Sequence, residues 1–162
     1  MQAVYFNKRR LGKTVLIILL AALIFAVCFI IDAGRDTAVP EYVVSGKNGR
    51  IFTEVSDIES RKKFFKQFAI EILPESEKKD KVIIPEKFTA VYKSYNRLQK
   101  KSGFNLEKYK GIKVERARYA LKGGGKAEIL VHRGSVIAGH RCSGIYGEKY
   151  SPLIKQVKNG KN

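Results

Sequence analysis

The sequence has 162 residues, enough for one membrane-spanning segment and one soluble domain of roughly 120 residues with its own core. Lys and Arg number 32 against 15 Asp and Glu, and this formal net charge of +17 bears on partners and location rather than on fold. In the soluble part Lys is interspersed with Glu and Asp, which is typical of an ordinary solvated surface. Cys28 lies in an apolar segment and Cys142 lies far along the soluble part, so we expect no disulfide and a fold held by its core.

An apolar segment near the N-terminus predicts a membrane anchor. Residues 15–31 read VLIILLAALIFAVCFII without a charge, and residues 14–33 together are long enough to cross ~30 Å of hydrocarbon. Basic residues dominate the preceding segment, whereas the segment that follows mixes one Arg with three acidic residues. The positive-inside rule therefore places residues 1–13 in the cytoplasm and the C-terminal domain outside. The cations that carry this prediction are Lys8, Arg9, Arg10 and Lys13.

Three alternatives to an anchor are less consistent with the residues. A cleaved signal peptide usually has an apolar region of 7–15 residues, and Ile31 stands where a cleavage site at Ala33 needs a small residue. Lipid attachment at Cys28 would need Gly or Ala in place of Val27. A buried core helix would be excessive for so small a domain. We therefore predict a single-pass cell-membrane protein, and the lack of a disulfide framework outside the cell favours a Gram-positive envelope over a eukaryotic secretory route.

The first half of the soluble part predicts a linker, a helix and a short strand. Residues 34–52 contain Gly and Pro and are predicted to be a juxtamembrane linker with one short strand near residues 42–44. Ser56 and Glu59 match a capping box that would begin a helix. The pattern gives this helix an apolar face of Ile58, Phe65, Phe68 and Ala69, and a solvated face of Arg61, Lys62, Lys63 and Lys66. A strand over residues 70–73 is expected to stop at Pro74.

A second helix and a three-stranded meander follow. After a charged loop and a short strand over residues 82–84, Pro85 is expected to open a helix that ends near Gly103. Its inward stripe is predicted to be Phe88, Val91, Tyr92, Tyr95 and Leu98. Alternation over residues 112–121, 127–132 and 135–142 predicts three antiparallel strands, with a bulge near Arg116 and turns at residues 123–125 and 133–134.

These elements predict an α+β fold in which two helices pack on one face of an antiparallel sheet. The folded domain is expected to span residues 53–150, outside the membrane. Residues 151–162 are rich in Lys and are predicted to be a basic, frayed tail.

The soft-metal ligands of the predicted domain do not converge. His140 and Cys142 share one face of a strand, but a two-residue turn at residues 133–134 would set His132 roughly 15–20 Å from His140. Zinc needs three or four ligands within ~2.3 Å. We therefore expect no metal and no cofactor, and a Cys-His nucleophile fails because no third orienting group is evident.

Other chemistry-bearing patterns are also weak. Gly123 to Lys126 lacks the spacing of a phosphate-binding loop and predicts a hairpin turn. The carboxylates Glu71, Glu75, Glu77 and Glu86 show no mark of a catalytic pair. Tyrosines interleaved with Lys and Arg could stack on single-stranded nucleic acid, but an outward-facing domain makes nucleic acid an unexpected partner. The basic surface instead suits anionic lipid head groups or anionic wall polymers.

The residues also resemble a known family. The second predicted helix and the meander are similar to an uncharacterised bacterial domain family, domain of unknown function 4830, typical of Gram-positive membrane-anchored proteins. The likeness spans roughly residues 57–147 and implies a membrane-tethered envelope domain without a known activity. This chain has Ala69-Ile70 where Gly-Trp is common in the family, and His140 where an acidic residue is common. The resemblance is carried by Ile84-Pro85, Phe88, Val91-Tyr92, Tyr95-Asn96, Leu98-Gln99, Gly103-Phe104, Leu106, Tyr109, Gly111, Leu130-Val131, Gly134, Val136-Ile137 and Cys142-Ser143.

The leading functional hypothesis is a non-enzymatic binding module at the cell envelope, which contacts a protein partner or an anionic surface from its tether. An extracytoplasmic enzyme of unidentified reaction is the alternative. A third possibility is a membrane-tethered regulatory or sensory subunit, which would act through contacts within the membrane. A pocket in which titratable groups converge would favour the enzyme, and a convex basic or apolar surface would favour binding.

Overall fold

A computed structural model describes residues 17–24, 26, 41–45, 49–145, 147 and 149–154. The chain divides into two units, Met1–Thr37 and Ala38–Asn162. In the first unit residues 17–24 and 26 are helical, and much of the predicted 14–33 span lies outside the described residues, as do Lys8, Arg9, Arg10 and Lys13. No helix within the described part of the chain is both long and apolar enough to span a membrane.

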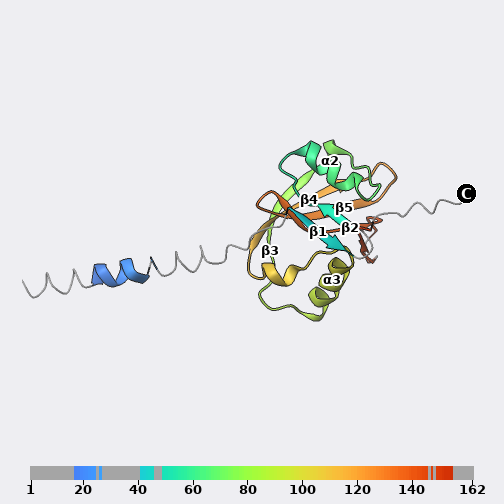
Figure 1. The fold of residues 1–162 in the computed structure, drawn as a ribbon. Coiled ribbons are helices and arrows are strands. Elements are labelled where there is room, and N and C mark those ends of the chain that lie inside the picture. The colour runs from blue at the N-terminus through green and yellow to red at the C-terminus, as the bar shows by residue number, and fades with distance from the viewer. Residues whose placement is uncertain are drawn as a thin grey trace, which may run out of the picture. The chain divides into compact units, whose positions relative to one another are not determined.

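The second unit has the predicted α+β composition (Figure 1). Its five-stranded antiparallel sheet has the order β3-β4-β5-β6-β7, so the predicted meander is confirmed as β4-β5-β6. A separate hairpin, β1-β2, precedes the helices. The strands are β1 (Tyr42–Ser45), β2 (Gly49–Phe52), β3 (Lys78–Ile83), β4 (Lys113–Ala120), β5 (Lys126–His132), β6 (Ser135–Cys142) and β7 (Ser151–Pro152); the helices are α2 (Ile58–Lys66) and α3 (Ala90–Lys101), with 3₁₀ turns η1 (Pro74–Ser76) and η2 (Leu106–Tyr109).

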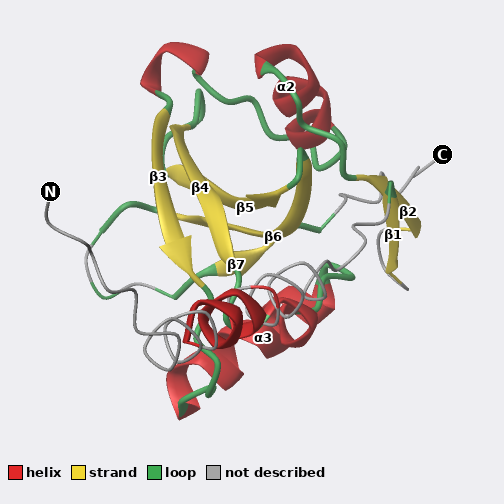
Figure 2. Ribbon diagram, turned by 90° about the vertical axis from the view of Figure 1, so that its left-hand side faces the viewer, coloured by secondary structure: helices red, strands yellow, loops and turns green. Residues whose placement is uncertain are grey.

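The helices cover both faces of the sheet, so the prediction that they share one face is wrong. Figure 2 shows α2 and α3 on opposite sides of the strands. The reason lies in the strand pattern, because β5 buries Ile129 and Val131 in one core cluster and Leu130, between them, in another. A strand that is apolar on both faces needs a covering layer on each of them.

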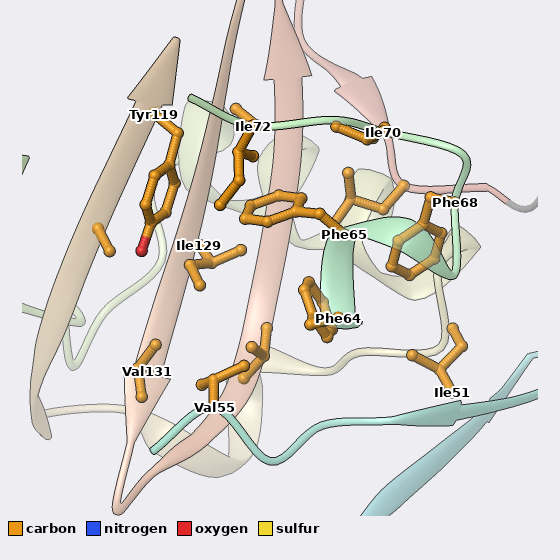
Figure 3. Packing of buried hydrophobic residues seen from close by; sticks show 14 of the residues in the cluster. Ile51, Val55, Phe64, Phe65, Phe68, Ile70, Ile72, Tyr119, Ile129 and Val131 are labelled. Carbon is orange, nitrogen blue, oxygen red and sulfur yellow. The ribbon is translucent and has the colours of Figure 1, made fainter. Parts of the chain in front are cut away.

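The larger cluster fills the space between α2 and the sheet (Figure 3). Phe64, Phe65 and Phe68 project from the helix and its end, and each is at most 2% exposed. The Phe65 and Tyr119 rings meet edge to face with centroids 5.4 Å apart. Burial of one such side chain contributes about 1.5–3 kcal/mol, so this aromatic group accounts for much of the attachment of α2.

Both helices begin later than predicted. The N-cap of α2 is Asp57 instead of Ser56, and Asp57 forms a reciprocal capping box with Ser60. The N-cap of α3 is Thr89, whose hydroxyl accepts a hydrogen bond from the Tyr92 N–H, so Pro85 lies in the preceding loop. A cap depends on which side chain reaches the first free N–H groups, and several candidates close together in sequence satisfy the same pattern.

The strand pairings differ from prediction in two places. The segment over residues 70–73 forms only one isolated bridge, between Ile72 and Leu121, whereas β3 begins earlier, at Lys78. No register shift occurs at Arg116, and the shift lies between β5 and β6, at Leu130/Val131. The change of phase in β4 reflects burial on both faces: Val114 packs with α3 and Ala117 packs with α2.

The domain also extends beyond its predicted limits at both ends. The predicted 34–52 linker contains the β1-β2 hairpin, and its Ile51 is fully buried in the core. The predicted 151–162 tail begins with β7, which pairs with β6, and Leu153 is fully buried. Residues 155–162 lie outside the described residues.

Candidate functional site

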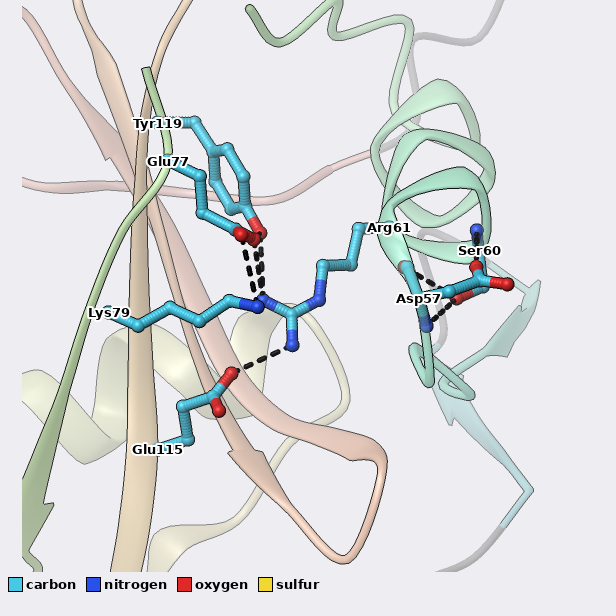
Figure 4. A network of polar contacts seen from close by, with 7 residues as sticks. All are labelled: Asp57, Ser60, Arg61, Glu77, Lys79, Glu115 and Tyr119. Carbon is cyan, nitrogen blue, oxygen red and sulfur yellow. Dashed lines mark hydrogen bonds and ion pairs between the residues drawn. The ribbon is translucent and has the colours of Figure 1, made fainter. Parts of the chain in front are cut away.

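The two faces of the sheet each hold a group of polar side chains. On the α2 face, Arg61 donates from Nη1 to Glu77 Oε1 at 2.8 Å and to the Tyr119 hydroxyl at 3.0 Å, and from Nη2 to Glu115 Oε1 at 2.7 Å (Figure 4). Lys79 contacts the other oxygen of Glu77 at 3.0 Å. Burial disfavours the guanidinium charge, but the hydrogen bonds to Tyr119 and Glu115 outweigh this cost and raise the pKa of Arg61.

This Arg61 network ties α2 to the sheet, and its donors and acceptors are largely occupied by one another. Arg61 is only 5% exposed, so its prediction as part of a solvated face is wrong. The spacing already contained the signal, because residue 61 lies three after Ile58 and four before Phe65, on the apolar stripe itself. Since both terminal nitrogens of the guanidinium bond to groups of the same domain, with only Nε left without a partner among the described residues, we assign the network a structural role.

The opposite face holds a pocket of about 290 Å³ between α3 and the sheet. Side chains from α3 and all five strands or their ends converge on it, and several of them are titratable. This α3 pocket is lined by Val82, Ile83, Val91, Tyr92, Tyr95, Arg116, Glu128, Leu130, His140 and Tyr150.

His140 and Tyr95 form the floor of the α3 pocket. The Tyr95 hydroxyl and His140 Nδ1 are joined by a hydrogen bond of 3.0 Å. His140 is 4% exposed, and burial lowers its pKa to about 4, so the ring is neutral at pH 7. Burial, with a smaller contribution from the charge of Glu128, raises the pKa of Tyr95. Both groups are therefore uncharged over the physiological range.

Glu128 and Arg116 bring charge to the α3 pocket. Glu128 lies opposite His140 across the β5-β6 pair, and burial raises the pKa of its carboxyl against the opposing influence of Arg116 and Arg118. Arg116 donates to both carboxylate oxygens of Asp80, from Nε at 2.9 Å and from Nη2 in a shorter contact. Within the described part of the chain, no hydrogen-bond donor reaches the Glu128 carboxylate, which leaves this charge available to a ligand.

Aromatic rings form the walls. The Tyr92 and Tyr95 centroids are 5.9 Å apart with planes at 70°, and those of Tyr95 and Tyr150 are 6.0 Å apart at 76°. Tyr150 also packs against His140, with a centroid distance of 4.1 Å. At the mouth, Val91 is 79% exposed and Tyr150 is 53% exposed. The pocket is thus open to solvent on one side and aromatic within.

The strand register places His132 and His140 apart, whereas His140 and Cys142 lie on the same strand. His132 pairs with Ser135, and His140 pairs with Glu128 instead of residue 127, which sets the histidines four residues, or about 13 Å, apart along β5. Cys142 is partly buried and free. Among the described residues, no group of three or more His, Cys, Asp or Glu side chains could hold a metal ion.

Sequence reasoning placed Tyr92 and Tyr95 on the correct face of α3 but missed Glu128, Arg116 and Tyr150. Glu128 offered a signal, because it is the one acidic residue in the otherwise apolar centre of β5. Tyr150 offered none, since its position depends on the return of the chain along β6.

Two further hollows lie along α2. One, of about 450 Å³, includes Phe52, Ser60 and Gln67, and the other, of about 500 Å³, includes Lys62, Lys66 and Glu71. Their charged linings are mostly exposed, whereas Arg116 and Glu128 of the α3 pocket are partly buried and its His140 is buried. We therefore take the α3 pocket as the candidate functional site, despite its smaller volume.

Residues 64–140 match the model of a family described as a domain of unknown function (DUF4830). The match begins within α2, includes β3, α3, β4 and β5, and ends at His140 in β6. It contains every lining residue of the α3 pocket except Tyr150. No curated protein and no solved structure matches the chain at a significant level.

Proposed function

Residues 64–140 belong to the family of domain of unknown function 4830, and from that premise we propose that the chain is a membrane-anchored, non-enzymatic binding module. Its folded domain would lie on the outer face of the cell membrane and bind a small ligand in the α3 pocket. The observation that carries this proposal is the convergence of Tyr92, Tyr95, Glu128 and His140 on one open pocket.

The sequence supports the anchor. Residues 15–31 are uncharged, and a basic N-terminal segment precedes them. The surplus of Lys and Arg supports contact with anionic lipid head groups or wall polymers, and a protein partner in the envelope fits the same proposal.

An enzyme is the second candidate, and the Tyr95–His140 hydrogen bond favours it. The pKa directions argue against it. A catalytic base works best with a pKa near the operating pH, whereas the pKa of His140 is about 4 and that of Tyr95 is raised. A neutral, hydrogen-bonded pair is better suited to shaping a pocket than to transferring protons at pH 7.

Cysteine labelling tests the topology. In a chain with Cys28→Ser and Cys142→Ser, we would introduce Lys108→Cys, at an exposed position in η2, and label intact cells with a membrane-impermeant maleimide. An outward domain predicts labelling without permeabilisation. Labelling only after permeabilisation would overturn the outward orientation. The matched control is Ala117→Cys, a fully buried position that should stay unlabelled in both samples while the domain is folded.

Native mass spectrometry tests the α3 pocket. We expect the full chain, extracted in a mild maltoside detergent, to retain a small-molecule adduct whose mass does not change on incubation. Val91→Trp should displace the adduct because the new ring would cover the mouth of the pocket. Lys93→Trp, also exposed on α3 but outside the pocket lining, should keep it. If the wild-type chain carries no adduct, or if Val91→Trp retains it, the pocket is not the ligand site.

A further inference from the structure

We propose that the α3 pocket binds a substituted ammonium group, with Glu128 as the counter-charge and the rings of Tyr92, Tyr95 and Tyr150 as the walls. This inference rests on the proposed function, since it names the ligand class of the same pocket. It does not depend on where in the cell the domain lies.

The arrangement of the rings suits a compact organic cation. A cation is attracted to the face of an aromatic ring within about 6 Å of its centroid. The ring of Tyr95 stands at 70° to that of Tyr92 and at 76° to that of Tyr150. Neighbouring rings that are nearly perpendicular present faces in different directions, and several faces can then surround one ammonium group. The domain already uses this contact elsewhere, because Lys110 Nζ lies 4.8 Å from the centroid of Phe88.

The charges of the α3 pocket also favour a cation. Asp80 accepts two hydrogen bonds from Arg116, which partly compensate the charge of Arg116, although the same carboxylate also lies 3.7 Å from Arg118. Glu128 receives no hydrogen bond from the described residues, although it faces the pocket beside Tyr92 and Tyr95. An anionic ligand would meet this carboxylate, whereas a cation would add a direct contact to the longer-range influence of Arg116 and Arg118.

A metal ion fits the same pocket poorly. Calcium and magnesium require six or more oxygen ligands, many of them carboxylates, and zinc requires several nitrogen, sulfur or oxygen ligands. The described part of the chain gathers no such set. A substituted ammonium is more weakly hydrated, so aromatic faces can replace its water. Exposed Ile83 and Val91 at the mouth would contact its alkyl substituents.

Titration with tetramethylammonium chloride tests this inference. The full chain in maltoside micelles has eight Tyr and no Trp, so its intrinsic fluorescence reports directly on tyrosine. We expect a saturable change with tetramethylammonium and none with sodium chloride at equal ionic strength. Glu128→Gln and Tyr150→Leu should each weaken the apparent affinity at least tenfold. Glu75→Gln is the matched control, since it removes one negative charge at an exposed position and should leave the affinity unchanged.

The outcomes separate this inference from the proposed function. Circular dichroism melting would first establish that Glu128→Gln and Tyr150→Leu are folded. Equal affinity in wild type and Glu128→Gln would overturn the ammonium inference, as would a retained native adduct that contains no ammonium group. Either result would leave the pocket as a ligand site. The absence of any small-molecule adduct on the wild-type chain in native mass spectrometry would overturn both proposals. Competition by vesicles with choline head groups would identify a lipid source, and competition by free choline alone would identify a soluble one.

Discussion

At the scale of single residues, the clearest difference between the structure and the sequence-based prediction is a buried charge. Arg61 belongs to a run of basic residues, yet it is held beneath α2 by Glu77, Glu115 and Tyr119. A buried charge costs several kcal/mol unless partners surround it. The partners come from β4 and from the residue between η1 and β3, more than fifteen residues away, so no local pattern could have indicated them.

Arg61→Met tests the Arg61 network. The substitution keeps much of the side-chain volume but leaves the Glu77 and Glu115 carboxylates without their shared partner. Since these carboxylates are partly exposed and can be rehydrated, we expect a loss of about 2–3 kcal/mol in the free energy of unfolding. Urea denaturation followed by circular dichroism measures it. Lys62→Met, at an exposed neighbouring position, should change stability by less than about 0.5 kcal/mol, and an equal loss in both variants would contradict the assigned role.

Glu128→Gln should stabilise the ligand-free domain at neutral pH. The pKa of Glu128 is raised on folding, chiefly by burial, so its protonated form is favoured in the folded state. The stability that comes from protonation is fully present below the pKa that the Glu128 carboxyl has in the unfolded chain. It is lost as pH rises through the pKa that this carboxyl has in the folded chain. The neutral amide introduced by Glu128→Gln does not ionise, so the variant does not lose this stability as pH rises. The difference in unfolding free energy between variant and wild type should therefore be positive at pH 7 and shrink below about pH 4.

Melting curves at several pH values measure this difference. A Glu128→Gln variant that is less stable than wild type at pH 7 would show that the carboxylate has a stabilising partner in the folded state. Tyr92 and Tyr95 stay neutral throughout this window because their pKa values are raised, whereas His140, with a pKa of about 4, gains charge at the acid end in both chains, so the difference between variant and wild type carries the result. A residue that lowers stability yet strengthens ligand binding is expected of a functional site.

At the scale of elements, the end of α2 shows a local conformation that a substitution can relieve. Ala69 has φ of 56°, in the left-handed region that favours glycine. Ala69→Gly should therefore raise the free energy of unfolding by about 0.5–1 kcal/mol. Denaturant titration of the two chains measures the change. Gly123→Ala is a useful comparison, because this glycine has an ordinary φ and open space around its Cα, and Ala there should not be destabilising. A loss of stability in Ala69→Gly would show that the alanine methyl makes contacts that outweigh the strain.

The C-terminal strand β7 is a second element in which the structure differs from the prediction, since residues 151–162 were predicted to be a frayed tail. Leu153 is fully buried in the cluster beneath α2, directly after β7. Ending the chain after Ile154 should leave the thermal midpoint of the domain nearly unchanged. Ending it after Tyr150 removes β7 and Leu153 and should cost about 2–5 kcal/mol, as for a large-to-small change in a core. Equal midpoints for the two truncations, measured by circular dichroism, would return residues 151–154 to the status of a tail.

At the scale of the whole molecule, the two units of the chain carry separate parts of the proposed function. The first unit would hold the protein in the bilayer, and the second would present the α3 pocket. Alkaline carbonate extraction of isolated membranes tests the anchor. We expect the full chain to remain in the membrane pellet and a chain without residues 14–33 to be released. Release of the full chain would show that the apolar segment does not span the bilayer.

Much of the fold of the second unit was predictable because it depends on local patterns. The meander β4-β5-β6 follows from alternation and from glycine-rich turns, and both are read within a few residues of each other. Errors appeared where distant segments decide the outcome. Ile51 joins the core only after the hairpin folds back, and helices on both faces follow from double-sided burial in β5. The cap of α2 is a local error of another kind, because the adjacent Ser56 and Asp57 both fit the pattern.

The candidate site was predictable only in part. Tyr92 and Tyr95 follow the helical period of α3, and His140 was recognised as a residue of possible chemical interest. Glu128, Arg116 and Tyr150 join them through strand register and through the return of β7 along β6. Residues that are far apart in sequence can line one pocket only when the pairing of strands brings them together.

The sequence by itself determined the strongly basic charge, the uncharged N-terminal segment, the absence of a disulfide framework and the presence of a helix-and-meander domain, because each depends on composition or on short-range periodicity. Only the tertiary structure decided that α2 and α3 cover opposite faces, that Glu77 and Glu115 are the partners of the buried Arg61, and that Glu128 lies among tyrosines. Those features depend on which distant segments meet in the interior. The free energy of burying a charge or an apolar side chain there depends on all of the groups that surround it.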